Sequence, residues 1–147
     1  MSTYKLISVV KTTEKETQSI YNKDDFKTAS DDMCNAFGVA LKADTTLAVY
    51  CSVIDNETGK VVDNLYWTDQ SVQVSDAIKP RVYTHNDYQE DNIAAYDSEK
   101  LALGNFYTKW ATYSKKEDCN FAIVVLLDNM GNETVRMVKK QEVKEEK

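Results

Sequence analysis

The chain has 147 residues, of which 42% are hydrophobic and 29% charged, and its formal net charge is −6. A chain of this length corresponds to one domain, which can bury a core without disulfides or a metal. No basic stripe is present, so the composition argues against direct binding to DNA, RNA or an anionic membrane.

The first predicted elements are two strands, a helix and a hairpin. Residues 4–10 are apolar and β-branched, which predicts a strand, and residues 17–21 predict a second, short one. From Asp24 or Asp25, the candidate N-caps, apolar side chains recur every three or four residues up to Leu41, which predicts an amphipathic helix. The sequence then predicts a hairpin from two β-type runs separated by a polar turn: residues 47–54, the turn 55–59 and residues 60–67.

A less regular stretch separates this first set of elements from a second, similar set. It holds the only proline, the only histidine and several acids, with short strands predicted at 72–74 and 81–83. Asp97 or Ser98 is the candidate N-cap of a second helix. A second hairpin follows, with strands at 121–127 and 133–138.

The two halves register when the sequence is shifted by 73 residues. Met33 then falls on Phe106 in the helices, and Asp55-Asn56 falls on Asp128-Asn129 in the turns. The alignment takes one extra residue before the second hairpin, which places Val49 on Ile123. Because core positions and turn residues agree together, we interpret the chain as an internal repeat.

The repeat predicts an α+β fold of two tandem, divergent strand–helix–hairpin units, with antiparallel sheet and two packed helices. The expected organisation is a single domain, 1–147. It comprises unit one (about 1–68), a connector (about 69–95), unit two (about 96–140) and a charged tail (141–147). Whether the two units face each other or lie side by side stays open.

The inventory of reactive residues argues against an enzyme. His85 is the only histidine, no nucleophile motif accompanies it, and we interpret it as a solvated loop residue. The three cysteines show no CxxC spacing, so neither a disulfide framework nor a metal site is expected, and no cofactor is predicted. The first residues lack an apolar h-region, and a cytoplasmic location is expected.

Tyrosines among acids in the connector suggest a protein-binding surface. The candidate partner-binding residues are Tyr83, Asp87, Tyr88, Glu90 and Asp91. The competing interpretation is that these rings cover the joint between the units.

The first half, from Ile7-Ser8-Val9-Val10-Lys11-Thr12-Thr13 to Val53-Ile54-Asp55-Asn56, resembles small uncharacterised proteins of phages and mobile elements of Firmicutes. The second half resembles another copy of the same unit. Proteins of that style include anti-CRISPR and other anti-defence inhibitors, several of which act as acidic decoys on basic nucleic-acid channels. The resemblance implies no functional residue.

These observations favour a non-enzymatic acidic protein that binds the basic surface of another protein. An inhibitor of a nucleic-acid-binding host defence protein would act in this way. Two alternatives stay open. One is a structural or self-assembling mobile-element protein that forms homo-oligomers through edge strands. The other is a small-ligand binder or cryptic enzyme that uses the cleft between the units.

Overall fold

The computed structural model describes residues 3–69, 78–87, 92–117 and 119–139, which form two four-stranded antiparallel sheets and two helices. The first sheet has the strand order β2-β1-β3-β4, and the second has the order β6-β5-β7-β8. The first unit comprises β1 (Tyr4–Thr12), β2 (Glu16–Lys23), α1 (Phe26–Lys42), β3 (Thr46–Asp55) and β4 (Val61–Thr68). The second unit comprises β5 (Arg81–Asn86), β6 (Asn92–Ala95), α2 (Glu99–Lys115), β7 (Ala122–Leu127) and β8 (Glu133–Lys139).

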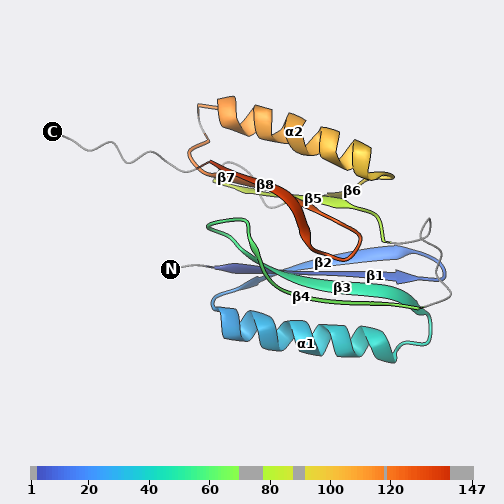
Figure 1. The fold of residues 1–147 in the computed structure, drawn as a ribbon. Coiled ribbons are helices and arrows are strands. Elements are labelled where there is room, and N and C mark those ends of the chain that lie inside the picture. Colours follow the sequence, from blue (N-terminus) through green and yellow to red (C-terminus); the bar gives the residue numbers. More distant parts are fainter. Residues whose placement is uncertain (1–2, 70–77, 88–91, 118, 140–147) are drawn as a thin grey trace.

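The elements stack in four layers, in the order α1, first sheet, second sheet, α2 (Figure 1). This arrangement confirms the predicted α+β class with two similar units. The units face each other through their sheets, and the helices cover the two outer faces. No helix within the described ranges combines the length and apolar character needed to cross a membrane.

The two helices confirm the 73-residue repeat. Each has 17 residues, and each begins after a side-chain cap: Asp25 accepts the N–H of Thr28 at 2.7 Å, and Ser98 accepts the N–H of Leu101 at 3.1 Å. Such caps satisfy backbone donors that have no partner inside the helix. The buried positions are equivalent as well, with Ala29 and Met33 in α1 and Ala102 and Phe106 in α2.

The predicted register of the second hairpin is wrong by one residue. Tyr50 and Ile54 face the other sheet, as do Ile123 and Leu127, so the 73-residue shift continues through the strands. Val49 is the neighbour of Tyr50, and side chains alternate between the faces of a strand. The expected match of Val49 with Ile123 would therefore pair opposite faces. The continuous apolar run 121–127 shows no alternation from which the face could be read.

The second sheet begins inside the range that the sequence analysis assigns to the connector. The predicted strand at 81–83 is confirmed and extends to Asn86, and β6 pairs with it. Arg81, Thr84 and Asn86 are polar but buried, which hides the strand pattern in the sequence. The strand predicted at 72–74 lies outside the described residues.

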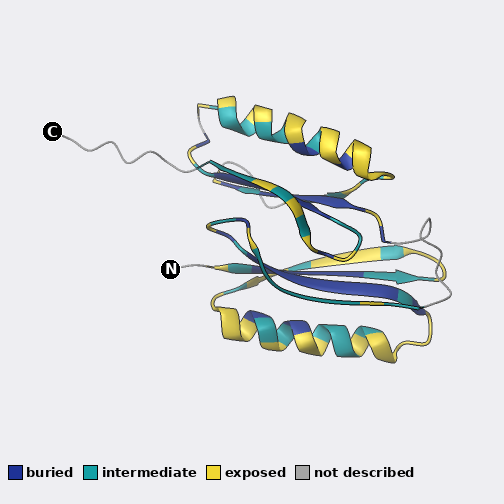
Figure 2. Cartoon of the chain, viewed as in Figure 1, coloured by how far each residue is buried: buried dark blue, intermediate teal, exposed yellow. Residues whose placement is uncertain are grey.

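The shared core lies between the sheets, and Figure 2 shows their inner strands β3, β5 and β7 as mostly buried. Both hairpin turns reach across it. Gly59, at φ 74°, approaches Ile123 and Val125, and Gly131, at φ 82°, approaches Tyr50 and Ser52. Under the 73-residue shift Tyr50 is equivalent to Ile123 and Ser52 to Val125. Each unit therefore inserts its turn at the same place in the other.

A buried ion pair also joins the sheets. The Arg81 side chain is only 3% exposed, and its Nη1 lies 2.5 Å from Oε1 of Glu16 on β2. Arg81 Nε also donates to Gln18 at 2.8 Å, and Gln18 donates to the carbonyl of Ile93 at 3.1 Å. One edge of the first sheet is thus fixed to the second sheet by charge and hydrogen bonds.

The turn glycines should be more sensitive to alanine than the helix glycines. A Cβ at residue 131 would lie 2.4 Å from Tyr50 Cδ1, and one at 59 would lie 2.5 Å from Ile123 Cγ2, both at positive φ. We expect Gly131→Ala and Gly59→Ala each to lower the free energy of unfolding by about 2 kcal/mol or more. Gly38→Ala and Gly104→Ala meet nothing within 4 Å and should be neutral or stabilising, by up to about 1 kcal/mol. Urea unfolding of the four variants checks the contrast, and equal effects would contradict the interlocked turns.

Removing Glu16 should be costly because it leaves Arg81 charged and buried. We expect Glu16→Ala to lower the free energy of unfolding by about 3 kcal/mol. The exposed pair Lys27–Asp31 is the control, and Asp31→Ala should cost less than about 0.5 kcal/mol. Chemical denaturation measures both. A loss at Glu16 as small as that at Asp31 would show that the ion pair does not join the sheets.

Candidate functional site

Tyr83 is not available to a partner. Its side chain is fully buried between the sheets, and its hydroxyl donates to Asn56 Oδ1 at 3.0 Å. The prediction of Tyr83 as a surface residue therefore has to be corrected. The sequence analysis predicted a strand at 81–83 but counted Tyr83 among the surface residues of the connector, whereas its ring lies in the shared core.

Asp87 is exposed, but its carboxylate links the end of β5 to the segment that precedes β7. It accepts the backbone N–H of Asn120, at 3.1 Å to Oδ1, and that of Phe121, at 3.3 Å. Partial desolvation acts to raise the pKa of Asp87, and these backbone donors outweigh it, so the pKa lies below its ordinary value. Tyr88, Glu90 and Asp91 lie outside the described residues. Of the predicted connector surface, the structure therefore describes only buried Tyr83 and exposed Asp87.

Among the described residues, the histidine and the buried cysteines lie in different segments of the fold. His85 lies on β5, not in a loop as predicted, and its ring packs edge-on against Phe121 with centroids 5.8 Å apart. Cys51 and Cys119 are buried free thiols, and burial raises the pKa of each. A raised pKa disfavours the reactive thiolate. No group of three or more His, Cys, Asp or Glu side chains in the described part of the chain is placed to hold a metal.

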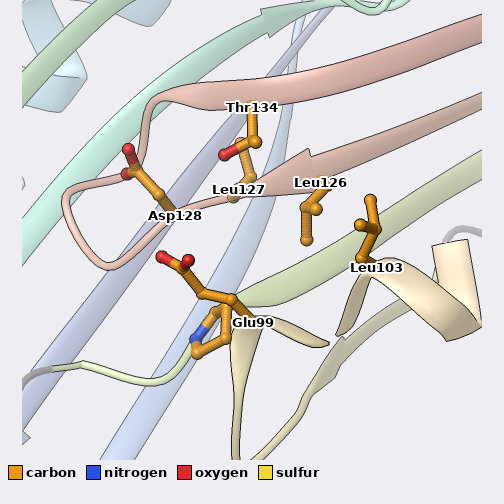
Figure 3. Close-up of a pocket in the computed structure, with 7 residues that line it drawn as sticks. Glu99, Leu103, Leu126, Leu127, Asp128 and Thr134 are labelled. Carbon is orange, nitrogen blue, oxygen red and sulfur yellow. The ribbon is translucent and has the colours of Figure 1, made fainter. Parts of the chain in front are cut away.

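One small, partly enclosed hollow lies where α2 begins, beside the end of β7. Its volume is about 80 Å³. Figure 3 shows Glu99 and Asp128 toward one end and Leu103 and Leu126 toward the other. The residues that line it are Pro80, Glu99, Leu103, Leu126, Leu127, Asp128 and Thr134.

A larger, open groove of about 360 Å³ lies between β4 and the turn before β8. Its polar groups are already used within the protein. Asn64 Nδ2 donates to the carbonyl of Met130 at 3.0 Å, Asp63 accepts from Ser30 at 2.9 Å, and Glu133 accepts the N–H of Val61 at 3.2 Å. The bonds of Asn64 and Glu133 join the two units, and that of Asp63 joins α1 to β4, so these side chains are not a free set of ligands.

The two helix layers differ in charge although they are equivalent in the repeat. Residues 24–44 carry five aspartates and two lysines, whereas residues 97–117 carry three acids and four lysines. Asp24 and Asp44, at the two ends of α1, are exposed. Asp31 is exposed and pairs with exposed Lys27, and Asp32 pairs with Lys23 at 2.6 Å. The α1 layer, defined here as residues 24–44, is therefore the acidic outer face.

Sequence reasoning assigned the acidic partner surface to the connector and not to α1. The signal that distinguishes the layers was present in the repeat itself. The difference in charge between residues 24–44 and 97–117 becomes visible when charged residues, and not only apolar ones, are compared at equivalent positions.

Protein-family models, curated proteins and solved structures were all compared with the chain, and none of them shows a significant match.

The role of Asp87 predicts a pH dependence of stability. A carboxylate whose pKa is lowered in the folded state stabilises the fold above its unfolded pKa of about 3.9 and loses that contribution as pH falls through the folded pKa. The effect should be below about 1 kcal/mol because the side chain is exposed. We expect Asp87→Asn to lower the free energy of unfolding at pH 7 and to make no difference near pH 2. Urea titrations across this pH range measure it, and a pH-independent difference would rule out the ionised carboxylate as the cause.

Proposed function

We propose that this protein is a non-enzymatic binding protein whose acidic α1 layer occupies a basic surface on another protein. The charge difference between two otherwise equivalent helix layers carries the proposal. A basic surface built to receive nucleic acid is a natural target for such a layer. The proposed role is inhibition of a nucleic-acid-binding host defence protein, as the resemblance to anti-defence inhibitors implies.

The scaffold supports a binding role. Two sheets share one closed core, and the outer layers are helices of 17 residues. A helix of that length extends for about 25 Å, which is comparable with the width of a standard protein interface. A rigid surface loses little conformational entropy on binding, which favours affinity. Substrate chemistry would instead require an assembled set of reactive groups.

The charge on α1 should act mainly through long-range attraction. Exposed carboxylates contribute little each as ion pairs, yet together they steer a basic partner and raise its association rate. Salt screens this attraction over about 10 Å at 0.1 M ionic strength. Binding by the α1 layer should therefore weaken as salt increases, and nucleic acid should compete for the same partner.

The test compares two neutralised variants that are matched by the repeat. Asp24→Asn/Asp44→Asn removes two charges from the α1 layer, and Asp97→Asn/Glu117→Gln removes two from the equivalent positions around α2. A bacterial lysate is passed over each immobilised protein, and the captured basic protein is then measured by surface plasmon resonance at 50 and 300 mM salt. We expect the α1 variant to bind about five- to tenfold more weakly at low salt and the α2 variant to bind within about twofold of the original.

Duplex DNA and RNA serve as competitors in the same measurement. Displacement by nucleic acid supports the decoy role. Equal losses in the two variants, or binding that ignores salt, would contradict a role for the α1 layer.

A further inference from the structure

The hollow beside α2 exists because two aromatic rings of unit one have no counterpart in unit two. In unit one, Tyr4 and Phe26 pack edge-to-face with ring centroids 5.9 Å apart. Lys5 pairs with Ile54 across β1 and β3, and Arg81 pairs with Leu127 across β5 and β7. Since Ile54 and Leu127 are equivalent, Tyr4 corresponds to Pro80.

The 73-residue shift places Phe26 on Glu99 in the same way, and both residues begin their helices. In unit two, Pro80 and Glu99 thus occupy the positions at which unit one has its two edge-to-face rings. Both residues line the hollow.

The lining combines an apolar wall with carboxylates. Leu103, Leu126 and Leu127 supply the wall, and Glu99 and Asp128 are the charged residues among the described residues of the lining. Asp128 Oδ1 accepts the N–H of Met130 at 2.8 Å and that of Asn132 at 3.0 Å, which fixes the carboxylate in place. The nearby ammonium of Lys79 pairs with Asp97 at 3.0 Å. The described residues of the lining therefore contribute negative charge and include no lysine or arginine.

The volume restricts the occupant. At about 80 Å³ the hollow has roughly half the volume of the 150 Å³ cavities that hold benzene. It is too small for a sugar or a nucleotide, but because it is only partly enclosed it admits the end of a flexible, unbranched side chain. Lysine has such a side chain, with a compact ammonium at its end.

We propose that this hollow receives a lysine side chain of a partner protein. The methylene groups lie against Leu103 and Leu126, and the ammonium lies at the end that holds Glu99 and Asp128. Arginine is a poorer fit because its planar guanidinium is larger than an ammonium. This inference does not depend on the proposed function of the α1 layer, since α1 and α2 are the opposite outer layers of the molecule (Figure 1).

The test uses three acetylated, amidated tripeptides, Gly-X-Gly, in which X is lysine, norleucine or arginine. The full-length protein is titrated with each, and the methyl resonances of Leu103, Leu126 and Leu127 are followed by NMR. We expect the lysine peptide to shift these resonances at millimolar concentration, with an affinity at least about threefold above that of either other peptide.

Three variants locate the effect. Glu99→Gln should weaken the lysine peptide about three- to fivefold and leave norleucine unchanged. Glu99→Phe restores the aromatic ring of unit one and should abolish binding of all three peptides. Glu117→Gln, outside the hollow, is the control and should match the original protein. The backbone NMR spectrum of each variant verifies that it is folded.

Several outcomes would overturn the proposal. Equal binding of lysine and norleucine would make the carboxylates irrelevant, and the absence of methyl shifts would show that the hollow does not admit the side chain. A higher affinity after removal of residues 140–147 would mean that lysines of this chain, and not those of a partner, occupy the hollow.

Discussion

The contact between the two sheets is the constraint on which the rest of the structure depends. Each helix covers one face of its sheet, so the other face of each four-stranded sheet needs a second apolar surface. The two units supply that surface to each other, and their turns cross the joint at equivalent places. Gly59 and Gly131 allow the backbone of each turn to touch the opposite sheet where a side chain would collide. The shared core is consequently closed, and we assign the proposed binding to the outer layers.

Buried charge at the edge of this joint fixes its orientation. Lys5 and Arg81 occupy equivalent strand positions, and each is 3% exposed. Their contacts differ: Lys5 donates to Asn22 on the neighbouring strand of its own sheet, whereas Arg81 reaches Glu16 and Gln18 on the other sheet. Apolar contacts alone tolerate sliding, but a buried ion pair tolerates little displacement because separation leaves both charges desolvated. The pair therefore specifies how the sheets align.

The sequence allowed the elements and the repeat to be predicted because they depend on local patterns. Caps, helical periodicity and turn glycines all act within a few residues, and the structure confirms them at Asp25, Ser98 and Gly59. The face of β7 could not be predicted, since an unbroken apolar run fits either register. The connector was misjudged because buried Arg81 and Thr84 look like surface residues. Of the predicted site residues, Tyr83 is buried and Asp87 is hydrogen-bonded to the backbone. The hollow could not be predicted, because the equivalence of Tyr4 and Pro80 becomes visible only from the strand pairing.

The missing pair of rings in unit two also shows what is gained by carrying both units on one chain. In a symmetric homodimer, any substitution appears twice, and replacing both Tyr4 and Phe26 would remove their packing from both outer layers at once. A tandem duplication is free of that coupling. Unit one keeps its edge-to-face pair of aromatic rings and maintains stability. Unit two is free to accumulate changes such as Pro80 and Glu99. Asymmetry of this kind gives a single small protein two surfaces that evolution can alter separately.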